Sequence, residues 1–81
     1  MEKRLGVIGI VIDNREAAPM VNQVLSEHDS IIIGRMGVPY REKDVSVISL
    51  IIDGTTDQIG ALTGKLGSMR NVTVKSALTQ K

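Results

Sequence analysis

The hydrophobic residues of this chain change their spacing in a fixed order, and that order constrains the fold more than any other feature. Apolar runs typical of strands cover residues 4–12, 30–38, 45–52 and 71–79. Helical spacing of apolar residues covers residues 16–27 and appears again after residue 55. Strand, helix, strand, strand, helix, strand is the order in which two βαβ halves share one antiparallel sheet. The sequence therefore predicts an α+β, ferredoxin-like βαββαβ sandwich, with a four-stranded antiparallel sheet and two helices on one face.

The chain is short, and the predicted scaffold uses all of it. Its 81 residues are enough for one domain, so we expect a single domain over residues 1–81. Cysteine is absent, which excludes disulfides and thiolate metal sites. A domain of this size buries only roughly 60–65% of the surface of its unfolded chain. Without cross-links it depends on a dense core, on oligomerisation, or on both.

Charge is balanced along the chain. Ten basic and nine acidic residues give a net charge of +1, and no basic block appears, so we expect no direct binding to nucleic acid. The apolar run over residues 5–12 is too short to span a membrane, and no small-residue cleavage site follows it. The sequence thus predicts a cytoplasmic protein without membrane attachment.

Both expected helices carry one apolar stripe. In the first helix the stripe has the i, i+3, i+4, i+7, i+8 spacing of a core-facing surface and consists of Ala17, Met20, Val21, Val24 and Leu25. The second helix begins with a capping box from Thr55 to Gln58, and its stripe consists of Ile59, Leu62 and Leu66. Gly67 stands near its end, where a glycine cap is expected.

The first and third strands, which are central in this topology, are apolar on both faces. Two helices cover only one face of the sheet, so the other face would leave a large apolar patch in water, and such patches mark interfaces. We therefore expect a homo-oligomer, a dimer or a tetramer, packed through that open face. Ile8 and Ile10 are the interface residues that we assign to it. The alternative is that a small hydrophobic sheet tolerates some exposure.

Gly60, Gly64 and Gly67 lie on the face of the second helix opposite its apolar stripe. The segment over residues 60–66 lacks the spacing of a phosphate-binding P-loop and falls inside a helix. Glycine within a helix costs about 1 kcal/mol relative to alanine. We therefore interpret Gly60 and Gly64 as interface positions that a partner approaches closely. The alternative is that Gly67 is only a cap and that the other two glycines have no role.

Three segments are candidates for binding a small molecule. The hairpin over residues 35–43 contains Arg35, Tyr40 and Arg41, and arginine grips carboxylates and phosphates through paired hydrogen bonds. Two turns precede helix N-termini, which favour anions, and they supply Asp13, Asn14, Arg15, Gly54 and Thr55. The alternative for the hairpin is an ordinary solvated turn.

Neither a metal site nor a catalytic site is indicated. His28 is the only histidine, and at the end of a helix it is favoured as a cation by the helix dipole. A metal site would need several converging ligands. No Gly-x-Ser-x-Gly elbow or nucleophile–base pair is present. We therefore predict no metal, no cofactor, no catalytic residue and no enzymatic activity.

Several segments also carry a family resemblance. They read RMGVPYREK at residues 35–43, VSVI at 45–48, IDGTTD at 52–57, IGALTGKLG at 59–67 and VKSA at 74–77. Together they resemble the family of iron-only hydrogenase system regulators, and the resemblance covers essentially the whole chain.

This resemblance implies an ACT-like fold, similar to ACT domains and to the C-terminal ligand-sensing domain of the nickel regulator NikR. It implies a stand-alone regulatory or ligand-sensing domain of an iron-only hydrogenase system. Its implied partners are a small-molecule effector and a DNA-binding or hydrogenase-maturation protein. The alternative is a non-sensing scaffold or accessory protein for hydrogenase maturation. The nickel site of NikR uses several histidines and a cysteine, which this chain lacks, so the resemblance supplies no metal site.

Overall fold

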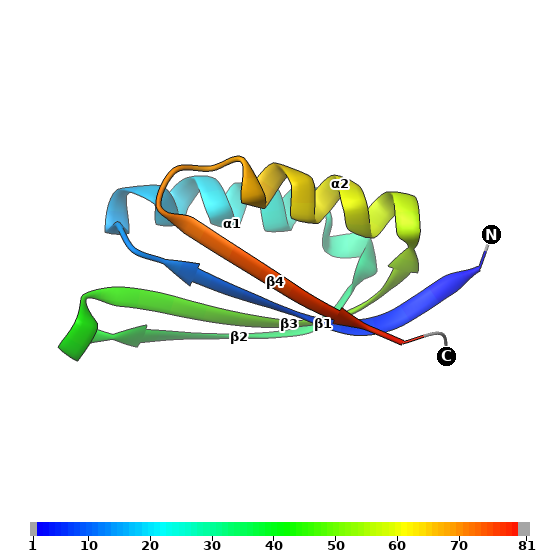
Figure 1. The fold of residues 1–81 in the computed structure, drawn as a ribbon, viewed down its shortest axis with the longest axis horizontal. Coiled ribbons are helices and arrows are strands. Elements are labelled where there is room, and N and C mark those ends of the chain that lie inside the picture. Colours follow the sequence, from blue (N-terminus) through cyan, green and yellow to red (C-terminus); the bar gives the residue numbers. More distant parts are fainter. Residues whose placement is uncertain (1, 80–81) are drawn as a thin grey trace.

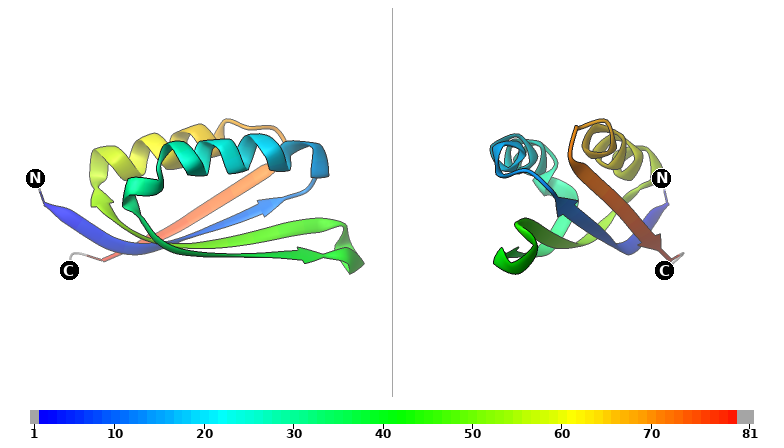
Figure 2. Two further views of the ribbon diagram at one scale, coloured as in Figure 1. Left: turned by 180° about the vertical axis from the view of Figure 1, so that it is seen from behind. Right: turned by 60° about the vertical axis from the view of Figure 1, so that its left-hand side comes forward.

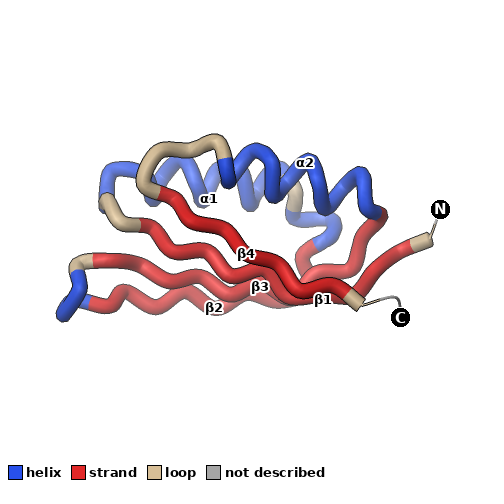
Figure 3. The backbone as a smooth tube through the Cα atoms, in the orientation of Figure 1, coloured by secondary structure: helices blue, strands red, loops and turns tan. Residues whose placement is uncertain are grey.

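The computed structural model describes residues 2–79 and places an antiparallel sheet against two helices (Figure 1). The elements are β1 (Lys3–Ile12), α1 (Ala18–Glu27), β2 (Ile32–Tyr40), β3 (Val45–Thr55), α2 (Thr56–Gly67) and β4 (Val72–Leu78). Single-turn 3-10 helices occupy three of the connections: η1 (Arg15–Ala17), η2 (Asp29–Ile31) and η3 (Arg41–Lys43). The connections between elements are therefore short (Figure 3).

The sheet has the strand order β2-β3-β1-β4, and every neighbouring pair is antiparallel. β1 and β3 lie at its centre and pair from Lys3 opposite Thr55 to Ile12 opposite Ser46. Both helices cover the same face of the sheet, as two further views show (Figure 2). The predicted ferredoxin-like βαββαβ sandwich, with a four-stranded antiparallel sheet and two helices on one face, is therefore confirmed.

The core lies between the sheet and the helices, and its buried side chains are all aliphatic. They are Ile8, Ile10, Ile12, Val21, Leu25, Ile31, Ile48, Leu50, Ile52, Ile59, Leu62 and Leu66. Ile8 and Ile10 are 0% exposed, so our assignment of these two residues to an interface is wrong. Successive side chains of a strand point to opposite faces, and both sets in β1 are apolar. Hydrophobicity alone therefore did not show which set faces the helices.

The face of the sheet away from the helices, called the open face from here on, carries the other set of side chains. Register places Val7 opposite Ile51 and Val11 opposite Val47 on this face. Its exposed large hydrophobic side chains are Leu5, Val7, Met36, Val38, Tyr40, Val47 and Ile51, which are 40–68% exposed. The open face is therefore as apolar as the sequence predicts, although its residues differ from those we assigned.

The predictions for the two helices agree with the structure to different degrees. Thr55 and Gln58 form the predicted capping box, since Gln58 N donates to Thr55 Oγ1 at 3.1 Å and Thr55 N donates to Gln58 Oε1 at 2.9 Å. In α1 the stripe is narrower than predicted, because Met20 is 62% exposed. Gly67 is the last residue of α2 and has no positive φ, so it is not a left-handed cap. Neither helix in residues 2–79 is long and apolar enough to cross a membrane.

The glycines of α2 differ from Gly54 at the end of β3. A Cβ atom added to Gly60 or Gly64 would meet nothing within 4 Å. Gly54 is buried, and a Cβ atom there would lie 3.0 Å from Ile31 Cγ2 and 3.2 Å from Gln58 Oε1. Close packing thus explains Gly54, whereas no contact among the described residues explains Gly60 and Gly64.

We expect Ile10→Ala to lower the free energy of unfolding by about 2–5 kcal/mol, because it empties a fully buried site between the sheet and the helices. Met20→Ala on the exposed side of α1 is the control, and it should change stability by about 0.5 kcal/mol or less. Urea denaturation at one protein concentration measures both values. Equal losses in the two variants would contradict the burial described here.

We expect Gly60→Ala and Gly64→Ala each to raise the free energy of unfolding by about 0.5–1 kcal/mol, since alanine loses less backbone entropy in a helix. Gly54→Ala should lower it by about 1–3 kcal/mol, because the added methyl group is overpacked against Ile31. Urea denaturation compares the three variants. A change of oligomeric state in Gly60→Ala or Gly64→Ala would instead favour the interface interpretation of these glycines.

Candidate functional site

A groove runs between helix α1 and the β2–β3 hairpin. It consists of two hollows of about 400 and 310 Å³. The hollows share the walls formed by Ile12, Ala18, Pro39 and Ser46. The groove exists because the hairpin reaches past the start of α1 at one end of the molecule (Figure 1). The walls that the two hollows share are mostly apolar, so the polar contacts available to a ligand come from the charged side chains that line each hollow separately.

Three arginines from three different elements line this groove, which we call the arginine groove. Arg15 of η1 and Arg41 of η3 line the larger hollow, and Arg35 of β2 lines the smaller one. The topology brings them together. The end of β1, which leads into η1, lies beside the start of β3, as the pairing of Ile12 with Ser46 shows. The turn that carries Arg41 therefore faces the turn that carries Arg15.

These arginines differ in how they are held. Arg35 Nη2 donates to Asn22 Oδ1 of α1 at 2.9 Å, which connects the helix to β2. Arg15 Nε lies 3.7 Å from Asp44 Oδ1, with side chains 81% and 79% exposed. An ion pair this exposed contributes little stability. The Arg41 backbone carbonyl accepts from Asp44 N at 3.2 Å, but its guanidinium group makes neither a hydrogen bond nor an ion pair within residues 2–79. Most of the donor capacity of the three guanidinium groups is therefore available to a ligand.

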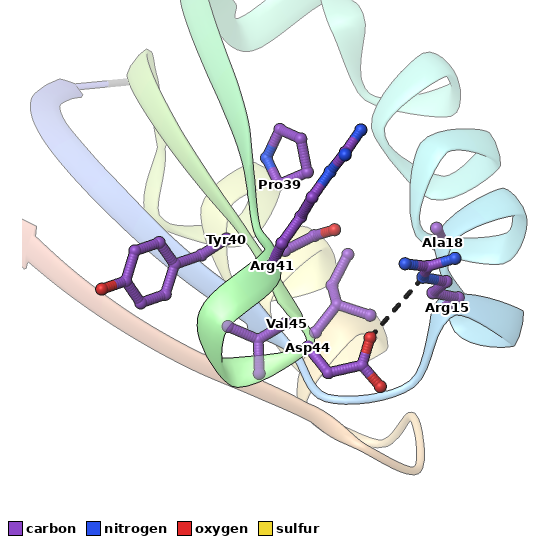
Figure 4. A pocket seen from close by; sticks show the side chains of 9 residues that line it. Arg15, Ala18, Pro39, Tyr40, Arg41, Asp44 and Val45 are labelled. Atoms are coloured by element: carbon purple, nitrogen blue, oxygen red, sulfur yellow. Dashed lines mark ion pairs between the residues drawn. The ribbon is translucent and has the colours of Figure 1, made fainter.

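Tyr40 was a candidate partner of these arginines, but its ring points away from them. Figure 4 shows the ring on the opposite side of the hairpin from the Arg15–Asp44 pair. The phenol donates to Glu42 Oε2 at 2.9 Å. The ring belongs to the open face, because Tyr40 lies two residues after Val38 along β2 and pairs with Val45.

The remaining candidate ligand residues do not join the arginine groove. Asp13 N donates to Asn71 O at 2.8 Å, and Asn14 Oδ1 accepts from Glu16 N at 3.0 Å, so both hold the turn before η1. Gly54 and Thr55 lie at the other end of the sheet, opposite Arg4 and Lys3 of β1. The eight ligand residues assigned from the sequence therefore do not form one site. The three arginines line the groove, the Tyr40 ring lies on the open face, Asp13 and Asn14 hold a turn, and Gly54 and Thr55 lie at the other end of the sheet.

Sequence reasoning missed several residues of the groove. Asn22, which orients Arg35, and Asp44, which pairs with Arg15, were not assigned, and neither were the walls formed by Ile12, Ala18, Pro39 and Ser46. No local pattern marks them, because they meet only when α1 packs over the hairpin. Within residues 2–79 no group of three histidine, cysteine or acidic residues lies close enough to hold a metal ion.

Comparison with solved structures shows similar folds. The chain is similar to the uncharacterized protein TM1266 from Thermotoga maritima, with a TM-score of 0.91 and 38% identity over 95% of this chain and 98% of that chain. The ACT domain of GTP pyrophosphokinase from Chlorobium tepidum gives a TM-score of 0.73 at 25% identity, covering 95% and 89% of the two chains.

A putative PII-like signaling protein from Thermus thermophilus shares the fold, with a TM-score of 0.62 at 11% identity over 98% and 92% of the two chains. No protein of curated function matches the sequence. Residues 4–76 match the TM1266-like family, and the chain belongs to this family, which is described as "Iron-only hydrogenase system regulator, putative".

Proposed function

We propose that this chain is a single regulatory domain of an iron-only hydrogenase system, which assembles with further copies through its open face and senses a small effector in the arginine groove. The family and the ACT-like fold support a regulatory role. The open face carries the proposal, because a face this apolar needs a cover.

The surface area supports a second copy as that cover. A compact monomer of 8.7 kDa exposes about 4,700 Å² by the usual scaling with mass. This chain exposes 5450 Å². The excess of roughly 700 Å² is close to the roughly 800 Å² that each partner buries in an interface of standard size. A face-to-face pair would thus bring the exposed area per chain near that of a compact monomer.

The side chains of the open face suit packing against a like surface. Gly9 and Ser49, which have small side chains, pair at its centre between the larger pairs Val7–Ile51 and Val11–Val47. Lys75 lies beside Gly9 at the β4 side of the sheet, and Asp53 lies at one end of β3. These charges flank the apolar centre, as expected of an interface with an apolar core and a polar rim.

The β2–β3 hairpin connects the open face to the groove. Register places the side chains of Val38 and Tyr40 of β2 on the open face, and both residues also border the groove that Arg35 and Arg41 line. A ligand that changes the position of the hairpin relative to α1 would therefore also change the surface offered to a second copy. The effector acts by favouring one assembly over another, which is a shift of population.

A scaffold or accessory role in hydrogenase maturation is the competing function, because the same open face could bind a different protein. A DNA-binding or maturation protein seated there would leave the purified chain monomeric. The two functions therefore differ in the oligomeric state of the isolated protein.

We expect the purified chain to sediment as a dimer or larger at micromolar concentration, and Ile51→Lys to shift it toward the monomer. A charge on Ile51, which is 48% exposed in the single chain, would be buried without a partner at the interface, a costly arrangement. Gln23→Lys on the exposed side of α1 is the matched control and should assemble normally. Analytical ultracentrifugation measures all three proteins.

Circular dichroism should show that Ile51→Lys keeps its secondary structure. A monomeric wild-type chain would contradict assembly through the open face and favour the scaffold function. An Ile51→Lys variant that still assembles would show that another surface joins the copies.

A further inference from the structure

We propose that the arginine groove binds a small dianion with carboxylate or phosphate groups at both ends and a short apolar segment between them. This inference deepens the proposed function by naming the class of effector, and it rests on that function only for the statement that the groove is the effector site. Binding by one chain does not require the open face to be covered.

The charge of the groove favours a dianion. Arg15, Arg35 and Arg41 line it, and Asp44 is the acidic residue among its walls, so the groove carries a net charge of +2. Asp44 offsets Arg15 only through a long, exposed ion pair of 3.7 Å. A ligand carboxylate or phosphate could replace that contact at small cost, because exposed ion pairs are weak.

The positions of the charges favour an anion at each end. Arg35, already oriented by Asn22, lines one hollow, and Arg15 and Arg41 line the other. A guanidinium group has five N–H donors, and Arg35 donates one of them to Asn22. The shared wall between the hollows is formed by Ile12, Ala18 and Pro39 together with Ser46. A ligand that spans both hollows would therefore place its anionic groups at the arginines and its apolar segment on this wall.

The groove is poorly suited to a nucleobase. Bases are often held in proteins by stacking on aromatic rings, and Tyr40 is the only aromatic residue of the chain. Tyr40 borders the larger hollow, but its ring points to the other side of the hairpin (Figure 4). Arg41 runs past Pro39 on the side of α1 in the same view, where it can reach an anion. The ligand class is thus a small dianion without a base.

Isothermal titration calorimetry at low ionic strength tests this inference, with succinate, 2-phosphoglycolate, acetate and AMP as the probes. We expect succinate or 2-phosphoglycolate to bind at least tenfold more tightly than acetate, because only a ligand with an anionic group at each end reaches both hollows. The better of these two ligands distinguishes two carboxylates from a phosphate paired with a carboxylate. Acetate that binds as tightly as both of them would overturn the inference, and so would AMP that binds more tightly than 2-phosphoglycolate.

Substitutions of the three arginines test whether the dianion binds in the groove. Arg15→Gln, Arg35→Gln and Arg41→Gln should each weaken the binding of the dianion by about tenfold or more, the usual scale for a charge-assisted hydrogen bond. Lys65→Gln, which removes an equal charge from α2 next to Glu27, should change it less than twofold. If Arg35→Gln fails to fold without its bond to Asn22, Arg41→Gln still tests the groove, since the guanidinium group of Arg41 has no partner within residues 2–79. Equal losses in Lys65→Gln and the groove variants would overturn the inference.

Sedimentation of the same proteins separates the two proposals. Dianion binding by an Ile51→Lys monomer would support the groove while leaving assembly to its own test. A wild-type oligomer that binds neither succinate nor 2-phosphoglycolate at millimolar concentration would overturn the groove inference and leave assembly through the open face intact.

Discussion

The antiparallel pairing of β1 with β3 is the contact on which the rest of the structure depends. It sets the phase in which Ile8 and Ile10 face the helices and Val7 faces away, because a slip by one residue would exchange the two faces of a strand. Close packing of Gly6 in β1 against β4, and of Gly54 in β3 against η2, keeps each strand in the same phase. A Cβ atom on Gly6 would lie 2.5 Å from Ala77 O of β4, and one on Gly54 would lie 3.0 Å from Ile31 Cγ2. The alternative phase would place larger side chains at points where neighbouring atoms leave no room.

Local patterns were enough to predict most of the fold. The change between strand and helix spacing gave the order of the elements, and the capping box at Thr55 located the start of α2. Local patterns did not predict which face of each central strand packs against the helices. Hydrophobicity distinguishes a buried face only when the other face is polar, and here Ile8 and Val7 are both apolar. The same limit applies to Met20, whose exposure depends on how α1 is rotated against the sheet.

The candidate site shows a different limit of sequence reasoning. The sequence marked Arg15, Arg35 and Arg41 as candidate anion-binding residues, but their position along one groove depends on α1 packing above the hairpin. The separation of Asp13 from Gly54 follows from topology, because the turns after two antiparallel neighbours lie at opposite ends of the sheet. Asn22 and Asp44 had no local pattern to mark them, and only the packed structure shows that each contacts an arginine.

In the proposed function, the hairpin links effector binding to assembly. Its two faces belong to two different surfaces, since Met36 lies on the open face and Pro39 lines the groove. An effector changes an assembly equilibrium only through a difference in its affinity for the two states. A tenfold change needs about 1.4 kcal/mol of such difference, and a hydrogen bond to a charged group contributes about 1.5–3 kcal/mol. One arginine contact made in one assembly and lost in the other would therefore be enough to couple an anion to the proposed oligomeric state.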